Sequence, residues 1–413
     1  MIKRNILKSL QNHLDNPEMT ILTGPRQVGK TYLMRLMMED LVKSGQKTLF
    51  LNLDNDDDLI FFESQSRLVD YLKLQFGDSK GHVFIDEIQK KENAGVFLKG
   101  IYDQNLPYKF ILSSSGSLDL KAKIKESMAG RKRVFEIDPI SFDEFVNYKT
   151  DYKFEGKLHD FFKIEKNKSF SLLNEYLNFG GYPKVILAPT LNEKKAEISE
   201  IYKSYVEKDV TNLLKVEKPN SFSNLLKLLS SQIGGLVNVS ELSATIGISS
   251  KTVENYLWYL EETYIIKKVT PYYKNIRSEI TKSPIYYFVD LGLRNYLIGL
   301  FGLTVLPSEL TGHLFENFVF KGIKNLNIGD IHFWRTRDNA EVDFVIEKGL
   351  DLIPVEVKYK DLKLSKTTRS FKSFLTRYVP KESYIIHLGE DLDSKFKSSR
   401  VNFINYSRVN KIK

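Results

Sequence analysis

The chain of 413 residues contains no cysteine. This absence excludes disulfides, thiol nucleophiles, zinc sites with cysteine ligands and iron–sulfur clusters. It is typical of a reducing compartment, so we expect a cytoplasmic protein. No apolar run approaches the roughly 18 residues that cross a membrane, and no apolar segment of a signal peptide follows the N-terminal residues. We therefore expect no membrane partner and no export.

Composition and length indicate a folded protein with several domains. Hydrophobic residues make up 42% of the sequence and charged residues 27%, which is typical of globular proteins and unlike disordered ones. A single domain usually has about 100 to 200 residues, so a chain of this length is expected to contain more than one.

Positive charge gathers toward the C-terminus. The net charge is +9, and residues 355–413 hold 14 Lys and Arg against 6 Asp and Glu. A basic region of this kind favours a polyanionic partner, and DNA is the expected one. A lysine-rich surface that serves only solubility is the alternative.

The first third of the chain alternates short apolar segments with helical patterns. Strands are predicted at residues 19–22, 47–53, 82–85 and 110–112, with helices between them. Strands separated by helices form parallel sheets that are covered on both faces, so this region predicts an α/β core. Residues 141–267 have a helical pattern. Beyond residue 311 a helix precedes predicted strands at 331–334, 341–346 and 353–358, which indicates a second α/β unit.

A phosphate-binding loop, the Walker A motif, lies between the first predicted strand and the following helix. It fits the pattern G-x-x-x-x-G-K-[ST] and consists of Gly24, Pro25, Arg26, Gln27, Val28, Gly29, Lys30 and Thr31. The glycines allow successive backbone N–H groups to point at a phosphate, beside the positive end of a helix. We expect Lys30 to reach the β- and γ-phosphates of ATP and the Thr31 hydroxyl to hold Mg²⁺. A plain turn is the alternative.

Two acids close the third predicted strand. Asp86 is expected to hold Mg²⁺ through water, and Glu87 to act as the general base that polarises the attacking water. A helix N-cap with an acidic first turn is the alternative. The next strand leads into the serine-rich residues 113–117, where Ser114 is our candidate for contact with the γ-phosphate or the water. An ordinary serine-glycine loop would have the same composition.

These motifs and four later segments resemble a prokaryotic ATPase family of the AAA+ superfamily. The later segments are Ala129-Gly130-Arg131, residues 139–145, Gly180-Gly181-Tyr182-Pro183 and residues 205–210. The resemblance covers nearly the whole chain, including the family's C-terminal region of unassigned function. It implies an AAA+ type core, ATP and Mg²⁺ as cofactors, and an arginine that acts on the γ-phosphate. Arg131 is our candidate, in its own subunit or in a neighbouring copy of a homo-oligomer, and a solvated basic turn is the alternative.

Residues 239–257 have the pattern of a helix-turn-helix. Ser240 is the expected cap of the first helix, Gly247 the turn, and Ser249 or Ser250 the cap of the second. In proteins that read DNA, the first residues of the second helix face the major groove. Here these residues are Ser250, Lys251, Thr252 and Asn255, and a basic wing would contain Lys274, Arg277 and Lys282. A winged helix used only for packing is the alternative.

A third group of candidate functional residues lies near the C-terminus. It comprises Glu316 on a predicted helix, Asp343 on a predicted strand, and Glu356 and Lys358 on the next strand. Positions two apart on a strand project from the same face, so Glu356 and Lys358 point together. This order resembles the PD-(D/E)xK nuclease-like fold, which implies that the acids bind a metal ion and that Lys358 orients or activates water. A simple salt bridge and a fold kept without cleavage are the two alternatives.

The predicted organisation has four parts. They are a P-loop ATPase core at residues 1–150, a helical region at 151–230, a winged helix-turn-helix at 231–310 and a restriction-nuclease-like α/β unit at 311–413. We predict a protein that hydrolyses ATP with Mg²⁺ and acts on or with DNA. One alternative is a nucleotide-dependent switch with a protein partner and a non-cleaving nuclease-like scaffold. The other is an ATP-gated, metal-dependent nuclease.

Overall fold

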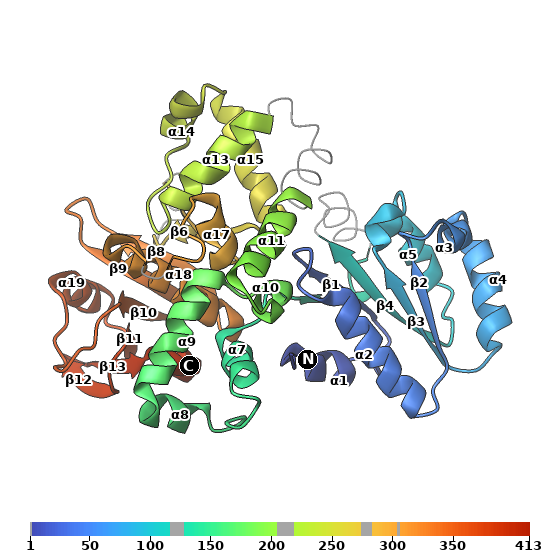
Figure 1. Cartoon of the computed structure of the whole chain (residues 1–413), viewed down its shortest axis with the longest axis horizontal. Coiled ribbons are helices and arrows are strands. Elements are labelled where there is room, and N and C mark those ends of the chain that lie inside the picture. Colours follow the sequence, from blue (N-terminus) through green and yellow to red (C-terminus); the bar gives the residue numbers. More distant parts are fainter. Residues whose placement is uncertain (1, 116–127, 205–218, 274–282, 304–305) are drawn as a thin grey trace.

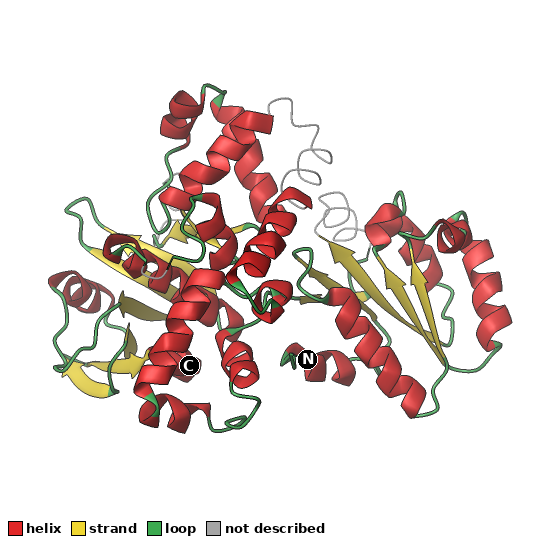
Figure 2. Cartoon of the chain, in the orientation of Figure 1, coloured by secondary structure: helices red, strands yellow, loops and turns green. Residues whose placement is uncertain are grey.

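A computed structural model describes residues 2–115, 128–204, 219–273, 283–303 and 306–413, which lie in two halves joined at a central junction (Figure 1). In this part of the chain the strands form two sheets, ordered β2-β3-β4-β1-β5 and β12-β13-β11-β10-β9-β8-β6-β7. The first sheet lies in the half formed by the N-terminal residues, and the second lies in the other half, surrounded by helices (Figure 2).

The first sheet is parallel at every strand pair, as the alternation of strands and helices predicts. Its strands are β1 (Met19–Gly24), β2 (Thr48–Asn52), β3 (Gly81–Asp86), β4 (Tyr108–Ser115) and β5 (Lys132–Glu136). The helices around it are α1 (Ile6–Asn12), α2 (Lys30–Lys43), α3 (Asp56–Leu59), α4 (Gln65–Phe76) and α5 (Ala94–Tyr102). Because the strands are parallel, their carboxyl ends meet at one edge, where loops can converge on a ligand.

Helices cover both faces of this sheet. Leu22 of β1 packs in one hydrophobic cluster with Leu33 and Met34 of α2, while its neighbour Ile21 packs in a second cluster with Leu68 of α4 and Leu98 of α5. Successive strand residues point to opposite faces, so one buried run serves both layers.

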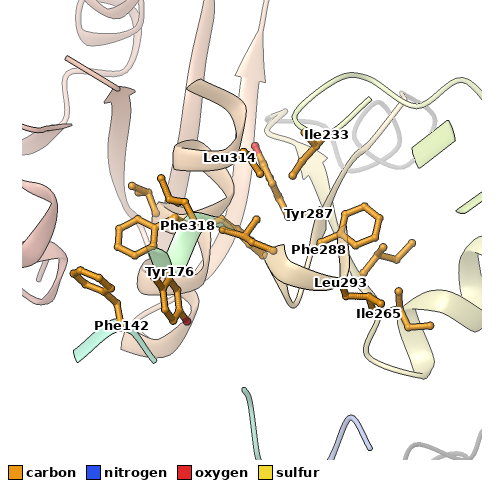
Figure 3. Close-up of a cluster of buried hydrophobic side chains, with 14 of the residues drawn as sticks. Phe142, Tyr176, Ile233, Ile265, Tyr287, Phe288, Leu293, Leu314 and Phe318 are labelled. Carbon is orange, nitrogen blue, oxygen red and sulfur yellow. The ribbon is translucent and has the colours of Figure 1, made fainter. Parts of the chain in front are cut away.

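The remaining helices lie between the two halves and around the second sheet (Figure 1). They are α7 (Phe142–Lys149), α8 (Leu158–Ile164), α9 (Lys166–Phe179), α10 (Pro183–Leu187), α11 (Leu191–Ile201), α13 (Pro219–Ser231), α14 (Val239–Ile246), α15 (Ser250–Glu262), α17 (Leu291–Leu297) and α18 (Ser308–Leu326). Buried aromatic residues of α7, α9, β7 and α18 lie in one cluster, which includes Phe142, Tyr176, Tyr287 and Phe318 (Figure 3). This cluster packs α7 and α9 against β7 and α18 of the second half.

The second sheet is mixed. Its strands are β6 (Ile266–Pro271), β7 (Ile285–Phe288), β8 (Asp330–Arg335), β9 (Glu341–Lys348), β10 (Asp351–Lys358), β11 (Glu382–His387), β12 (Leu392–Phe396) and β13 (Ser399–Asn405), with α19 (Arg369–Tyr378) against it and a terminal 3-10 segment at Tyr406–Lys411. Strand β6 pairs in parallel with β8, with Thr270 opposite His332. The strands after the helix-turn-helix and those of the C-terminal unit therefore share one sheet, although the sequence suggests two separate units.

Among the helices that the structure describes, none combines the length and the apolar character needed to span a bilayer.

Candidate active site

The phosphate loop connects β1 to α2 at the carboxyl edge of the first sheet. Gly24 has φ of 144°, and a Cβ at this position would overlap the carbonyl oxygen of Ile137, which follows β5. Gly29 is the N-cap of α2 and has φ of 96°. The loop thus needs glycine at both ends, once for close packing and once for a left-handed backbone.

Lys30 is buried inside the loop. Its side-chain ammonium donates to the carbonyls of Gly24 at 3.0 Å and Pro25 at 2.7 Å, and the residue is 5% exposed. Burial lowers the pKa of Lys30 to about 8, while the nearby carboxylates of Glu87 and Asp86 oppose this shift. A buried cation at a loop of backbone N–H groups fits the triphosphate of a nucleotide.

A chain of hydrogen bonds joins the loop to β3 and β4. The Thr31 hydroxyl donates to Asp86 Oδ2 at 2.7 Å, and the Ser113 hydroxyl donates to the other carboxylate oxygen of Asp86. Asp86 is 3% exposed. Hydroxyl and carboxylate oxygens are the ligands that Mg²⁺ takes, so this pair of residues fits the expected ion.

Glu87 is held next to this chain. Its backbone N–H donates to Ser113 Oγ at 3.0 Å, and its carboxylate accepts a hydrogen bond from the side-chain amide of Gln89. The residue has φ of 56°, a left-handed conformation that is uncommon for residues other than glycine. Its contacts therefore hold the backbone of Glu87 in this conformation, as expected of a carboxylate that must be oriented toward a substrate.

The serine that contacts Asp86 and Glu87 is Ser113, whereas the sequence-based candidate is Ser114. Ser114 is buried and pairs with Thr23 in the sheet. Neighbouring strand residues point to opposite faces, so when Ser113 faces Asp86 the side chain of Ser114 faces away. The sequence places the serines at this strand end but does not fix which one faces Asp86, and the role of either hydroxyl in catalysis stays a prediction. Residues 116 and 117 lie outside the described residues.

Arg131 lies at the opposite edge of the sheet. Its carbonyl accepts the N–H of Met19, the first residue of β1, while the phosphate loop follows the last residue of that strand. A strand rises about 3.3 Å per residue, so about 16 Å separate Arg131 from the start of the phosphate loop. The Arg131 guanidinium pairs with Asp103 at 2.8 Å. It does not reach the phosphate loop of its own chain, and an action on a neighbouring copy stays a prediction.

Two loop residues contact segments that the sequence does not connect to the site. The side-chain amide of Gln27 donates to Ser204 Oγ at 3.4 Å, beyond the end of α11. The carbonyl of Val28 accepts from Arg4 at 2.8 Å. Both contacts join positions far apart in the chain, so no local pattern predicts them.

The helix-turn-helix segment consists of α14 and α15. Gly247 makes the turn with φ of 74°, and Ser249 caps α15 by accepting the N–H of Thr252. The cap of α14 is Asn238, not the expected Ser240, because the Asn238 side chain accepts the N–H groups of the first turn. Residues 274–282, with the expected basic wing, lie outside the described residues, and the winged-helix assignment stays a prediction.

The C-terminal acids gather on adjacent elements. Asp343 accepts the backbone N–H of Val357 at 2.6 Å, and Glu356 pairs with Lys358 at 2.7 Å. Glu316, on α18, accepts from the Tyr287 hydroxyl. Burial and the charges of Glu316 and Glu356 raise the pKa of Asp343 well above its ordinary value.

The positions of these side chains do not by themselves make a metal-binding site. Within the described ranges, no group of three or more His, Asp or Glu side chains is arranged to hold a metal ion. Lys358 and Thr368 both contact Glu356 Oε1, whereas the buried Glu356 Oε2 has no hydrogen-bond partner in the described part of the chain. The salt bridge considered from the sequence is present, and metal binding stays a prediction.

Comparison with protein families gives three matches along the chain. Residues 16–146 match the AAA domain. Residues 171–304 match a domain of unknown function (DUF8612), and residues 311–408 match another domain of unknown function (DUF4143). The parallel sheet and its phosphate loop lie within the residues that match the AAA domain, so this match supports the AAA type core that the sequence predicts.

Curated relatives resemble the chain over most of its length. An uncharacterized protein of Methanocaldococcus jannaschii is 26% identical over 79% of this chain and 71% of its own. An uncharacterized protein of Haemophilus influenzae is 24% identical over 87% of both chains. AMPPCP-bound DnaA from Aquifex aeolicus, a solved structure, is 16% identical over 62% of this chain and 86% of its own, with a TM-score of 0.25.

Proposed function

We propose that this protein binds ATP with Mg²⁺ at the phosphate loop, hydrolyses it, and uses the cycle to move its C-terminal half relative to the ATPase core. The observation that carries the proposal is the hydrogen-bond chain from Thr31 through Asp86 to Ser113 beside the loop. The AAA domain match over residues 16–146 supports it.

Each residue of the site has a role in this proposal. The loop N–H groups and Lys30 bind the phosphates, and Thr31 and Asp86 hold Mg²⁺, which neutralises phosphate charge when bound. Lys30 exchanges the carbonyls of Gly24 and Pro25 for phosphate oxygens. Glu87 accepts the proton of the attacking water. The Gln89 amide and the Ser113 hydroxyl hold Glu87 in place before the substrate binds.

Contacts near the phosphate loop connect the ATPase core to the second half of the protein. Thr23, the residue before Gly24, lies near Tyr264, which precedes β6. Glu136, at the end of β5, binds Lys267 of β6 at 3.2 Å and Lys324 of α18 at 2.8 Å. A shift of the loop on nucleotide binding would act on these contacts, and this is how hydrolysis would reach the C-terminal half.

DNA is the partner that the charge distribution favours. The basic residues of 355–413 supply the attraction to phosphate. Helix α15 exposes Lys251, Asn255 and Trp258 about one turn apart. Lys251 lies 3.7 Å from Glu254, which weakens its attraction to DNA, so the C-terminal region would make most of the phosphate contacts.

Binding of labelled single-stranded, duplex and branched DNA tests this partner. Affinity should fall steeply between about 50 and 200 mM salt because each phosphate contact releases counterions. DNA should also change the rate of ATP turnover. Absence of binding to all three forms at low salt, with a fast basal turnover, would replace DNA by a protein partner and favour the nucleotide-dependent switch.

A homo-oligomer is the assembly in which Arg131 would act on the γ-phosphate. Arg131 lies on the edge opposite its own loop, so it would reach the nucleotide of a neighbouring copy. Mixing two inactive variants tests this role. Arg131→Ala keeps the loop and Lys30→Ala keeps the arginine, so the mixture should regain ATPase activity. A mixture without activity would remove Arg131 from the mechanism.

A metal-dependent nuclease is the second candidate function. It is favoured by the buried Glu356 Oε2, which has no hydrogen-bond partner among the described residues and lies beside Lys358 and near Asp343. A metal ion would give this oxygen a partner and relieve the repulsion among the acids. Nicking of plasmid DNA with Mn²⁺ or Mg²⁺ tests it, and no nicking under any condition leaves a non-cleaving scaffold.

A further inference from the structure

Arg4 is a nearly buried side chain that joins three segments around the phosphate loop. It precedes α1 and lies outside the AAA domain match, which begins at residue 16. One guanidinium nitrogen, Nη1, donates to the carbonyl of Val28 in the loop at 2.8 Å, and Nη2 donates to the carbonyl of Asp138 at 2.6 Å. The third, Nε, lies 3.4 Å from Glu144 Oε1, and 7% of the side chain is exposed.

We propose that Arg4 is a positioning residue of the nucleotide site, an inference that rests on the proposed ATP binding. A phosphate loop binds its ligand through backbone N–H groups, so its carbonyls must point elsewhere and find donors there. Val28 lies between Gln27, with φ of 60°, and Gly29, with φ of 96°. Arg4 supplies the donor for the carbonyl at this sharply turned position.

The planar guanidinium also fixes the loop relative to the segment that follows β5. Its donors form a rigid fork, so bonds to Val28 and Asp138 hold these two segments at a set separation. Glu144 anchors the fork, because its carboxylate accepts Nε of Arg4 and the backbone N–H groups of Asn5 at 2.6 Å and Ser141 at 2.8 Å. The loop is therefore ordered before the nucleotide arrives, which lowers the entropic cost of binding.

Loss of this fork should weaken nucleotide binding more than the chemical step. Arg4 touches neither the reacting atoms nor Glu87, so its removal takes away binding shared by ground state and transition state. For Arg4→Ala we expect the KM for ATP and the Kd for ADP to rise about tenfold or more, with kcat within about threefold of wild type. Arg4→Lys should be intermediate, because one ammonium cannot reproduce the fork.

The test measures kcat and KM for MgATP, and ADP affinity by calorimetry, on the full chain. Lys3→Ala is the matched control, since Lys3 is the adjacent cation and pairs with Glu155 at an exposed position. It should leave all values unchanged. Thermal unfolding of each variant checks folding, and if Arg4→Ala does not fold, Arg4→Lys and Arg4→Gln carry the test.

Lys30→Ala separates this inference from the proposed function. Turnover that survives Lys30→Ala would overturn ATP hydrolysis at this loop. Loss of turnover in Lys30→Ala, combined with a KM within twofold of wild type in a folded Arg4 variant, would overturn only the role of Arg4. A lower unfolding temperature with unchanged KM would leave Arg4 a purely structural residue.

Discussion

The carboxylate of Asp138 binds the ammonium of Lys324 at 2.9 Å, across the junction between the two halves of the protein. The same ammonium binds Glu136 at 2.8 Å, and Lys267 adds a second cation to Glu136 at 3.2 Å. We call these four residues the junction cluster. Because the carbonyl of Asp138 binds Arg4, Asp138 is tied to the phosphate loop on one side and to the C-terminal half on the other.

Lys324→Met should loosen this junction. The substitution keeps a long side chain but leaves two partly buried carboxylates short of a partner, so we expect a loss of about 1 to 3 kcal/mol, toward the lower value because the group is partly solvated. Urea unfolding measures the loss. Lys166→Met, which breaks an exposed pair with Glu390, is the control and should change little. Equal stability of Lys324→Met and wild type would remove the junction cluster from the account.

The junction cluster also predicts a pH dependence. Burial alone would raise the pKa of Glu136, but Lys324 and Lys267 lower it to about 2, from an ordinary value of 4.5. A carboxyl whose pKa is lower in the folded state stabilises the fold above pH 4.5, and this contribution is lost as the pH falls toward 2. The urea midpoint should therefore fall in that window, and it should fall less steeply in Lys324→Met. Parallel slopes would contradict the assignment.

Ser113→Ala should reduce ATP turnover more than Ser114→Ala. Removing the Ser113 hydroxyl takes one hydrogen bond from Asp86 and one from the backbone of Glu87. An unpaired buried group costs about 1 to 3 kcal/mol, which corresponds to a fall in kcat of roughly 5- to 160-fold if the loss acts on the transition state. Steady-state kinetics of both variants decides between them. A larger loss in Ser114→Ala would restore the residue selected from the sequence.

Asp343→Asn tests whether the C-terminal acids form a scaffold or a metal site. The amide oxygen can still accept the N–H of Val357. The substitution also removes one negative charge from the vicinity of Glu316 and Glu356. We expect the metal-free variant to unfold a few degrees above wild type, a gain of about 1 kcal/mol. Asp351→Asn, an exposed position on the same sheet strand β10, is the control.

Added Mn²⁺ distinguishes the two readings of that site. Stabilisation of wild type but not of Asp343→Asn, with nicking of plasmid DNA that the variant lacks, would establish a metal-dependent nuclease. No response of either protein to Mn²⁺ would leave a scaffold. A variant less stable than wild type in metal-free buffer would contradict the repulsion that we infer among the acids.

The sequence alone predicts those elements that are determined by their own residues and not by distant contacts. The buried apolar runs of β1, β3 and β4 and the glycines of the loop predict the position of the candidate nucleotide site, because a parallel sheet brings strand ends to one edge. Strand β5 was not predicted, since Lys132 and Arg133 give it the polarity of an exposed edge.

The remaining features depend on distant contacts. Arg4 meets Val28 and Asp138 only after the chain has folded, and nothing near Arg4 in the sequence marks it. The choice between Ser113 and Ser114 depends on how β4 is rotated against β3, which strand pattern alone leaves open. The pairing of β6 with β8 likewise depends on tertiary structure, so the sequence separated two units that share a sheet.

Binding and turnover of ATP by Glu87→Gln test the central claim most directly. The amide keeps the shape of the side chain but cannot accept a proton, so the variant should bind MgATP with wild-type affinity and turn it over at least about 100-fold more slowly. Lys30→Ala, measured alongside, should lose nucleotide binding. Turnover by Glu87→Gln equal to that of wild type would contradict the account of this site as an ATPase centre.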